Sequence, residues 1–183
     1  MAERPAVNAS PLIFSSRAGL LDMLRLEGEE IVIPKTVAEE IQRRGADDLT
    51  AQAIEKVPWL SVIESPPIPE TIRAWDLGDG ESTVLAWGHA NPGTVIIVDD
   101  LAARRCAATH GIPVRGTLGL ILSAKKRGLI PQARPVLENL RQSGMYLSDR
   151  ILNQALALIG ELAALKLPYV IDNQAHVRAQ GER

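Results

Sequence analysis

The clearest strand signal in the chain is Thr94-Val95-Ile96-Ile97-Val98-Asp99-Asp100, an uninterrupted apolar run that ends in two acids. Its β-branched residues do not alternate with polar ones, which is typical of a strand buried on both faces of a sheet. Such strands belong to parallel sheets, whose neighbours are joined by helical crossovers. Helical patterns lie on both sides of the run, at residues 81–90 and 101–110. The stretch therefore predicts the centre of an α/β fold.

Strands and helices continue to alternate away from this run. Strands are predicted at residues 6–8, 31–34, 60–64 and 112–114, and helices at about 10–26, 37–45, 47–56, 117–127, 132–143 and 149–165. Thr36 is the predicted N-cap of the helix that ends at Gly45. Strands separated by helices predict a three-layer α/β/α sandwich with a central parallel sheet and a helical C-terminal extension.

The domain organisation follows from these elements. We expect a main domain over residues 1–147 and a C-terminal helix over 148–166 that packs on it. Residues 167–183 form a tail without clear periodicity, for which disorder and an oligomer contact are the two alternatives.

The composition is that of a globular protein. The 183 residues are 46% hydrophobic and 23% charged, and the single cysteine excludes an internal disulfide and a cysteine-rich zinc site. No run approaches the ~18 apolar residues needed to cross a bilayer. The first ten residues carry Glu3 and Arg4 in place of a long apolar signal segment. We expect a soluble, cytoplasmic protein that does not enter a membrane.

The net charge of −2 conceals an uneven distribution. Residues 1–100 carry 8 Lys/Arg and 17 Asp/Glu, whereas residues 101–183 carry 12 and 5. An acidic site beside a basic surface suits a polyanion together with metal ions. The alternative is that solvated helix faces differ in sign along the chain.

Acids and an amide gather where the predicted strands end, which is where parallel sheets bind ligands. Asn8 ends the first strand, Asp99 and Asp100 follow the central one, and Glu40 and Glu81 lie on the helices between them. Each acid alone could be a helix-terminal or surface residue. Converging carboxylates would instead need a hard cation such as Mg²⁺ or Mn²⁺, which activates water for hydrolysis. No Ser/His or Cys/His pair offers a nucleophile, so metal-assisted hydrolysis fits the pattern best.

Five segments follow one another in the chain: Val7-Asn8-Ala9-Ser10-Pro11-Leu12-Ile13, Ile33-Pro34 with Val37-Ala38-Glu39-Glu40-Ile41, Leu77-Gly78-Asp79-Gly80-Glu81, Val95–Asp100 with Ala103-Arg104, and Gly116-Thr117-Leu118-Gly119. In this order they resemble the PIN-domain family over about residues 5–160. The subgroup they resemble most is a prokaryotic one, related to the toxin ribonucleases of toxin–antitoxin pairs.

The resemblance implies an endoribonuclease that uses Mg²⁺ or Mn²⁺ to hydrolyse single-stranded RNA. The implied catalytic acids, which also bind the metal, are Glu40, Glu81, Asp99 and Asp100, and Asn8 is a further metal ligand. Ser10 would support the site through its hydroxyl. Arg104 would pair with the acids or reach an RNA phosphate, and we expect the ion pair.

One position departs from the family pattern. Most PIN nucleases have aspartate where this chain has Asn8, and an amide offers an oxygen ligand without negative charge. The alternative function is therefore a catalytically silent PIN-fold module that binds RNA or protein. The resemblance also implies a homodimer and an antitoxin partner.

Overall fold

The computed structural model describes residues 4–161, and its centre is a sheet of five parallel strands. The strands lie in the order β3-β2-β1-β4-β5. Their bounds are β1 Ala6–Val7, β2 Ile31–Pro34, β3 Leu60–Ile63, β4 Ile96–Ile97 and β5 Val114–Arg115. Ala6 pairs with Val32 on one side and with Ile96 on the other, so β1 is the central strand.

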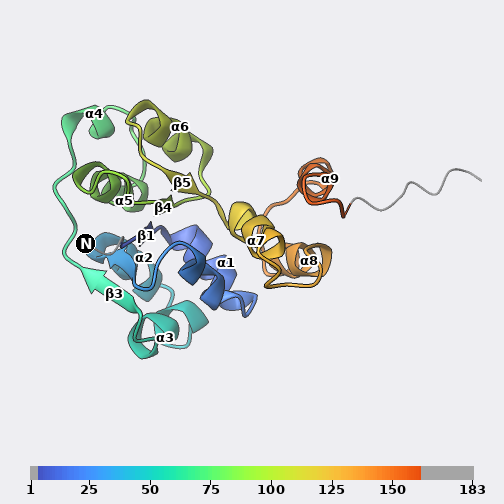
Figure 1. The fold of residues 1–183 in the computed structure, drawn as a ribbon. Helices are drawn as coiled ribbons and strands as arrows, with labels where there is room; N and C mark the ends of the chain where they lie inside the picture. Colours follow the sequence, from blue (N-terminus) through green and yellow to red (C-terminus); the bar gives the residue numbers. More distant parts are fainter. Residues whose placement is uncertain (1–3, 162–183) are drawn as a thin grey trace, which may run out of the picture.

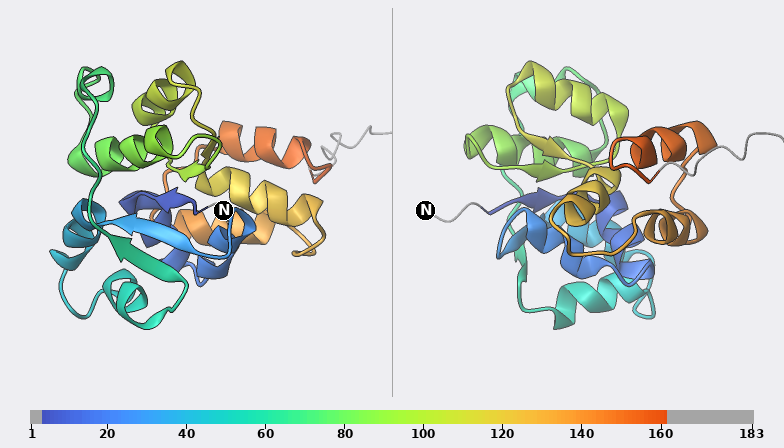
Figure 2. Two further views of the ribbon diagram at one scale, coloured as in Figure 1. Left: turned by 60° about the vertical axis from the view of Figure 1, so that its left-hand side comes forward. Right: turned by 45° about the vertical axis from the view of Figure 1, so that its right-hand side comes forward.

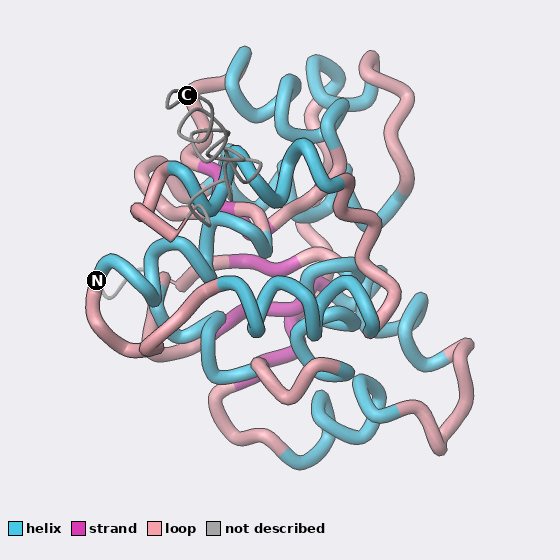
Figure 3. Tube along the Cα trace, turned by 90° about the vertical axis from the view of Figure 1, so that its right-hand side faces the viewer, coloured by secondary structure: helices cyan, strands magenta, loops and turns pink. Residues whose placement is uncertain are grey.

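Helices cover both faces of the sheet. Their bounds are α1 Ala9–Arg17, α2 Lys35–Gln42, α3 Leu49–Lys56, α4 Glu70–Arg73, α5 Asp79–Ala90, α6 Leu101–Thr109, α7 Thr117–Lys126, α8 Arg134–Gln142 and α9 Asp149–Ala157, with a 3₁₀ helix, η1, at Leu21–Leu26. Helices α1 and α3 lie on one side of the sheet and α5 and α6 on the other (Figure 1), with the strands in the interior (Figure 3). The predicted three-layer α/β/α fold is confirmed.

Several boundaries differ from the predicted ones. The helix predicted over residues 10–26 is two elements, because Gly19 adopts a φ of +68° and ends α1. The Leu20 N–H then bonds to the Ser15 carbonyl at 2.7 Å, a typical helix-terminating contact. The strand predicted over residues 94–98 pairs only at Ile96–Ile97. The helix predicted from residue 81 begins at Asp79, and the short helix α4 was not predicted.

The prediction that Thr36 is an N-cap is wrong. Helix α2 begins at Lys35, after Pro34, and no side chain caps it. Ser65 instead accepts a hydrogen bond from the Thr36 N–H at 3.0 Å, and its hydroxyl lies 2.6 Å from the Thr36 hydroxyl. These contacts tie the start of α2 to the loop after β3.

A second apolar cluster lies beside the main core. It joins α7, α8 and α9, which lie side by side at one end of the molecule (Figure 2), through Ile121, Leu137, Leu140, Leu152 and Leu156. Glu161 closes this end, because its carboxylate accepts hydrogen bonds from the N–H groups of Ala133 and Arg134 at the start of α8.

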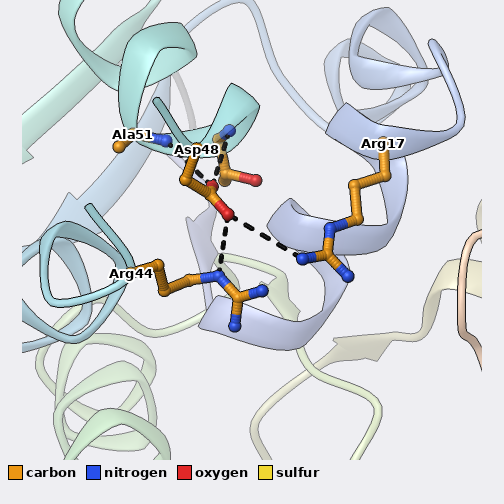
Figure 4. Close-up of polar contacts among 5 residues, drawn as sticks. Arg17, Arg44, Asp48 and Ala51 are labelled. Atoms are coloured by element: carbon orange, nitrogen blue, oxygen red, sulfur yellow. Dashed lines mark hydrogen bonds and ion pairs between the residues drawn. The ribbon is translucent and has the colours of Figure 1, made fainter. Parts of the chain in front are cut away.

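Asp48 ties the start of α3 to α1 and to the turn after α2. Its carboxylate caps α3 by accepting bonds from the N–H groups of Thr50 and Ala51. The same carboxylate lies 2.9 Å from Arg44 Nε and 3.8 Å from Arg17 of α1 (Figure 4). Burial acts to raise the pKa of Asp48, but the bonds from Arg44 and the α3 backbone outweigh it, and the pKa lies below its ordinary value.

Within residues 4–161, no helix combines the length and apolar character needed to cross a bilayer. The predicted tail at 167–183 lies outside the described residues, as do the last residues of the helix predicted over 149–165.

Candidate functional site

The sheet places Asn8 at the carboxyl ends of its central strands. Asn8 follows β1 directly, and its N–H donates to the Ile97 carbonyl of β4 at 3.0 Å. The residue is only 2% exposed, so its amide is shielded from water. The carboxyl edge of β1 and β4 therefore presents a buried amide to the helices that follow.

Glu81 meets that amide from the first turn of α5. Asn8 Nδ2 donates to Glu81 Oε1 at 2.9 Å, across 73 residues of sequence. A carboxylate in the first turn of a helix is stabilised by the helix dipole. The hydrogen bond fixes which end of the Asn8 amide faces Glu81, so Oδ1 faces elsewhere.

Gly80 lets two more oxygens approach α5. A Cβ atom at Gly80 would lie 2.9 Å from Asn8 Oδ1 and 3.1 Å from Glu40 Oε2. The two oxygens thus lie beside the same bare stretch of α5 backbone, and any side chain at this position would crowd them. Asn8, Glu40 and Glu81 come together because α5 begins with a glycine-rich turn.

The negative charge of this trio is only partly offset by Arg43 and Arg44, whose positive charges act to lower the pKa of Glu40. Burial and then the negative charge of Glu81 raise the pKa of the Glu40 carboxyl above its ordinary value. Asn8 Oδ1 is buried and accepts no hydrogen bond. An orphaned amide oxygen beside two carboxylates is an oxygen donor set of the kind that Mg²⁺ and Mn²⁺ prefer. The residues present therefore fit a hard divalent cation.

Asp99 is held by different partners. Its two oxygens accept bonds from the Thr117 N–H and the Thr117 hydroxyl, each at 2.7 Å. Thr117 is the first residue of α7, whose N-cap Gly116 has no side chain, so Asp99 supplies the cap from across the sheet edge. Burial raises the pKa of Asp99, against the opposing effects of the Thr117 bonds and of the Arg104 charge.

The remaining predicted site residues also have distinct places. Asp100 caps α6, because its carboxylate accepts a bond from the Ala103 N–H at 2.8 Å. Ser10 is exposed in the first turn of α1, next to Asn8. Arg104 was expected to pair with the acids, yet among the described residues its guanidinium forms no ion pair within 4.0 Å.

The predicted residues thus form two groups. The structure brings together Asn8, Glu40 and Glu81, whereas Asp99 and Asp100 are each engaged by a helix N-terminus. Within residues 4–161, no three side chains of the His, Cys, Asp or Glu types converge closely enough to hold a metal ion. A metal site beside Gly80 would therefore use the amide oxygen of Asn8 as its third ligand, after the carboxylates of Glu40 and Glu81.

Three residues that shape this edge were not singled out by sequence reasoning. Gly80 and Gly116 make room for the site oxygens, and Thr117 binds Asp99. The signals were present in the glycine-flanked segments Gly78-Asp79-Gly80-Glu81 and Gly116-Thr117-Leu118-Gly119. What could not be predicted is the pairing of Thr117 with an acid 18 positions earlier.

Comparison with known proteins agrees with the α/β/α fold. The model of a family described as PIN domain matches residues 5–161. The chain belongs to the PIN-domain family. PIN domains are generally nucleases, they usually use divalent metals such as Mg²⁺, and PIN nucleases act on RNA. The comparisons with curated proteins and with solved structures each found no match.

Proposed function

We propose that this PIN domain is a divalent-metal-dependent endoribonuclease that hydrolyses single-stranded RNA. The observation that carries the proposal is the orphaned Asn8 Oδ1, which lies with Glu40 and Glu81 beside a stretch of α5 backbone that only glycine leaves open. These three residues would hold Mg²⁺ or Mn²⁺. When bound, such a cation supplies an activated water and stabilises negative charge on the phosphodiester.

The chain's own residues orient this site. Asn8 Nδ2 fixes the Glu81 carboxylate by its hydrogen bond, and Glu81 in turn fixes the direction of Asn8 Oδ1. Asp99 is placed after the neighbouring strand by two bonds from Thr117, and it adds negative charge to the same sheet edge. We assign Asp99 a supporting role, and we assign Asp100 the capping of α6.

The test is cleavage of a complex RNA pool by the purified protein with Mn²⁺, with Mg²⁺ and with EDTA. We expect metal-dependent cleavage that is at least about a hundredfold slower in Glu81→Gln, because the variant keeps the contact with Asn8 but loses a charged ligand. Asp79→Asn is the matched control, since Asp79 is an exposed acid of the same helix turn. Cleavage unaffected by Glu81→Gln and by EDTA would refute the proposal.

A silent PIN-fold module that binds RNA or protein is the second candidate. Asn8 favours it, because an amide contributes no charge to a site in which only two acids converge. The variant Asn8→Asp separates the two candidates. A wild-type protein that does not cleave RNA, together with an Asn8→Asp variant that does, would support the silent module.

The toxin role rests on the subgroup that the sequence resembles, and an antitoxin partner and a homodimer belong to the same proposal. Sedimentation of the purified chain, alone and with the product of any adjacent small gene, tests both partners. A monomer that gains no partner would remove the toxin assignment and leave the nuclease proposal in place.

A further inference from the structure

We propose that Arg104 binds a phosphate of the RNA strand beside the Asn8–Glu40–Glu81 site. The inference rests on the proposed function only for the identity of the ligand as RNA. Its starting point is the position of Arg104 on α6, four residues after the cap Asp100 and at the same sheet edge as Asp99. A Cβ atom at Gly116 would lie 2.7 Å from Arg104 Nη1 and 3.0 Å from Asp99 Oδ1.

The Arg104 guanidinium lies near Asp99 but does not form an ion pair with it. Both Asp99 oxygens already accept bonds from Thr117, at the N-terminus of α7. The Arg104 charge is near enough to oppose the rise in the Asp99 pKa, yet the two groups do not form an ion pair within 4.0 Å. Arg104 therefore keeps its donors available beside Asp99.

Most other arginines of the described part of the chain are already engaged. Arg115, the residue before Gly116, pairs with the nearly buried Glu27 at 2.9 Å. Acids within 4.0 Å also engage Arg4, Arg17, Arg25, Arg44, Arg73, Arg134 and Arg141. Arg104 differs from them, because it is unpaired among residues 4–161 and its Nη1 lies beside the same Gly116 as Asp99 Oδ1.

The Arg104 guanidinium, placed beside Gly116 and Asp99, is suited to bind a phosphate. Guanidinium groups bind phosphate oxygens through two parallel N–H bonds. The strands β1 and β4 are neighbours, so Arg104 and Asp99 lie at a strand end adjacent to that of the Asn8–Glu40–Glu81 site. A phosphate held by Arg104 would keep the neighbouring phosphodiester close to Glu40 and Glu81.

The test measures RNA binding in EDTA, where metal-dependent cleavage cannot occur. A fluorescein-labelled single-stranded RNA is titrated with wild type, Arg104→Ala, Arg104→Lys and Arg105→Ala at several salt concentrations. We expect Arg104→Ala to weaken binding about tenfold and to lower the salt slope by about 0.7, the value for one phosphate contact to a single strand. Lysine at this position should restore the slope but only part of the affinity.

Arg105→Ala is the matched control, because Arg105 is the adjacent exposed arginine of the same helix. It should change affinity less than twofold. Equal losses in the Ala variants at 104 and 105, or wild type that does not bind RNA, would overturn the inference. Binding that depends on Arg104 without any cleavage in Mn²⁺ would refute the nuclease and leave the phosphate site standing. Cleavage by wild type that Arg104→Ala matches in rate and affinity would refute Arg104 alone.

Discussion

Asn8 uses the two ends of one amide for different purposes. Its Nδ2 neutralises part of the Glu81 charge through a 2.9 Å hydrogen bond, and its Oδ1 faces the bare backbone at Gly80 together with Glu40. An aspartate here could not donate this bond, and it would add a third negative charge to a site with a raised Glu40 pKa. The amide therefore reduces repulsion in the metal-free protein while keeping an oxygen ligand.

The raised pKa of Glu40 has a consequence for stability. Burial and the Glu81 charge disfavour the ionised form in the folded state, so the folded pKa lies above the ordinary 4.5. As pH rises from 4.5 through the folded pKa, the unfolded chain loses this proton first, and the free energy of unfolding falls. Glu40→Gln removes this fall, so its stability relative to wild type, measured by urea unfolding without metal, should increase across that window.

Glu39→Gln is the control for this experiment. Glu39 is the adjacent acid on α2, so Glu39→Gln removes the same charge from the same helix at a residue outside the Asn8–Glu40–Glu81 trio. A Glu40→Gln difference that stays constant with pH would show that the pKa of Glu40 is not raised in the folded protein.

For single residues, the sequence predicted where the acids lie in the fold, but it did not predict their hydrogen-bond partners. Asn8 and Glu81 could be predicted because they flank strand and helix ends, whose positions follow from local patterns. The engagement of Asp99 by Thr117 could not, because it depends on how α7 leaves the last strand. The alternation of side chains along a strand does not predict which hydrogen-bond donor will contact which carboxylate.

At the scale of elements, aspartates at helix starts decide how the layers join. Asp100 caps α6 and Asp99 reaches α7, so the acid pair after β4 anchors two helices on the sheet edge. The helices themselves followed from apolar periodicity, whereas their ends depended on single residues such as Gly19 and Pro34. Propensity predicts where a helix can form, and capping contacts made across the fold decide where it stops.

Asp48 provides the test of this capping principle. Its carboxylate holds the start of α3 and bonds Arg44, so Asp48→Ala should lower the free energy of unfolding by about 1–2 kcal/mol. Asp47→Ala changes an exposed neighbour and should have little effect. Chemical denaturation at neutral pH measures both, and equal effects at the two positions would contradict the assigned cap.

Across the whole molecule, the sheet order places the site at one edge. Strands β1 and β4 end side by side, α2 and α5 bring Glu40 and Glu81 to Asn8, and α6 and α7 bring Arg104 and Thr117 to Asp99. The α/β/α fold was predictable because buried β-branched strands alternate with helical patterns. The second cluster was not, because local patterns do not show that the consecutive helices α7, α8 and α9 pack on one another apart from the main core.

Titration calorimetry of Mn²⁺ into the metal-free protein tests the metal site most directly. The wild type and Asp79→Asn should each bind one ion with similar affinity, and Glu81→Gln should bind at least about tenfold more weakly because one of two charged ligands is lost. Circular dichroism confirms that each variant is folded. Equal Mn²⁺ binding by wild type and Glu81→Gln, or no binding by folded wild type, would contradict a metal site built from Asn8, Glu40 and Glu81.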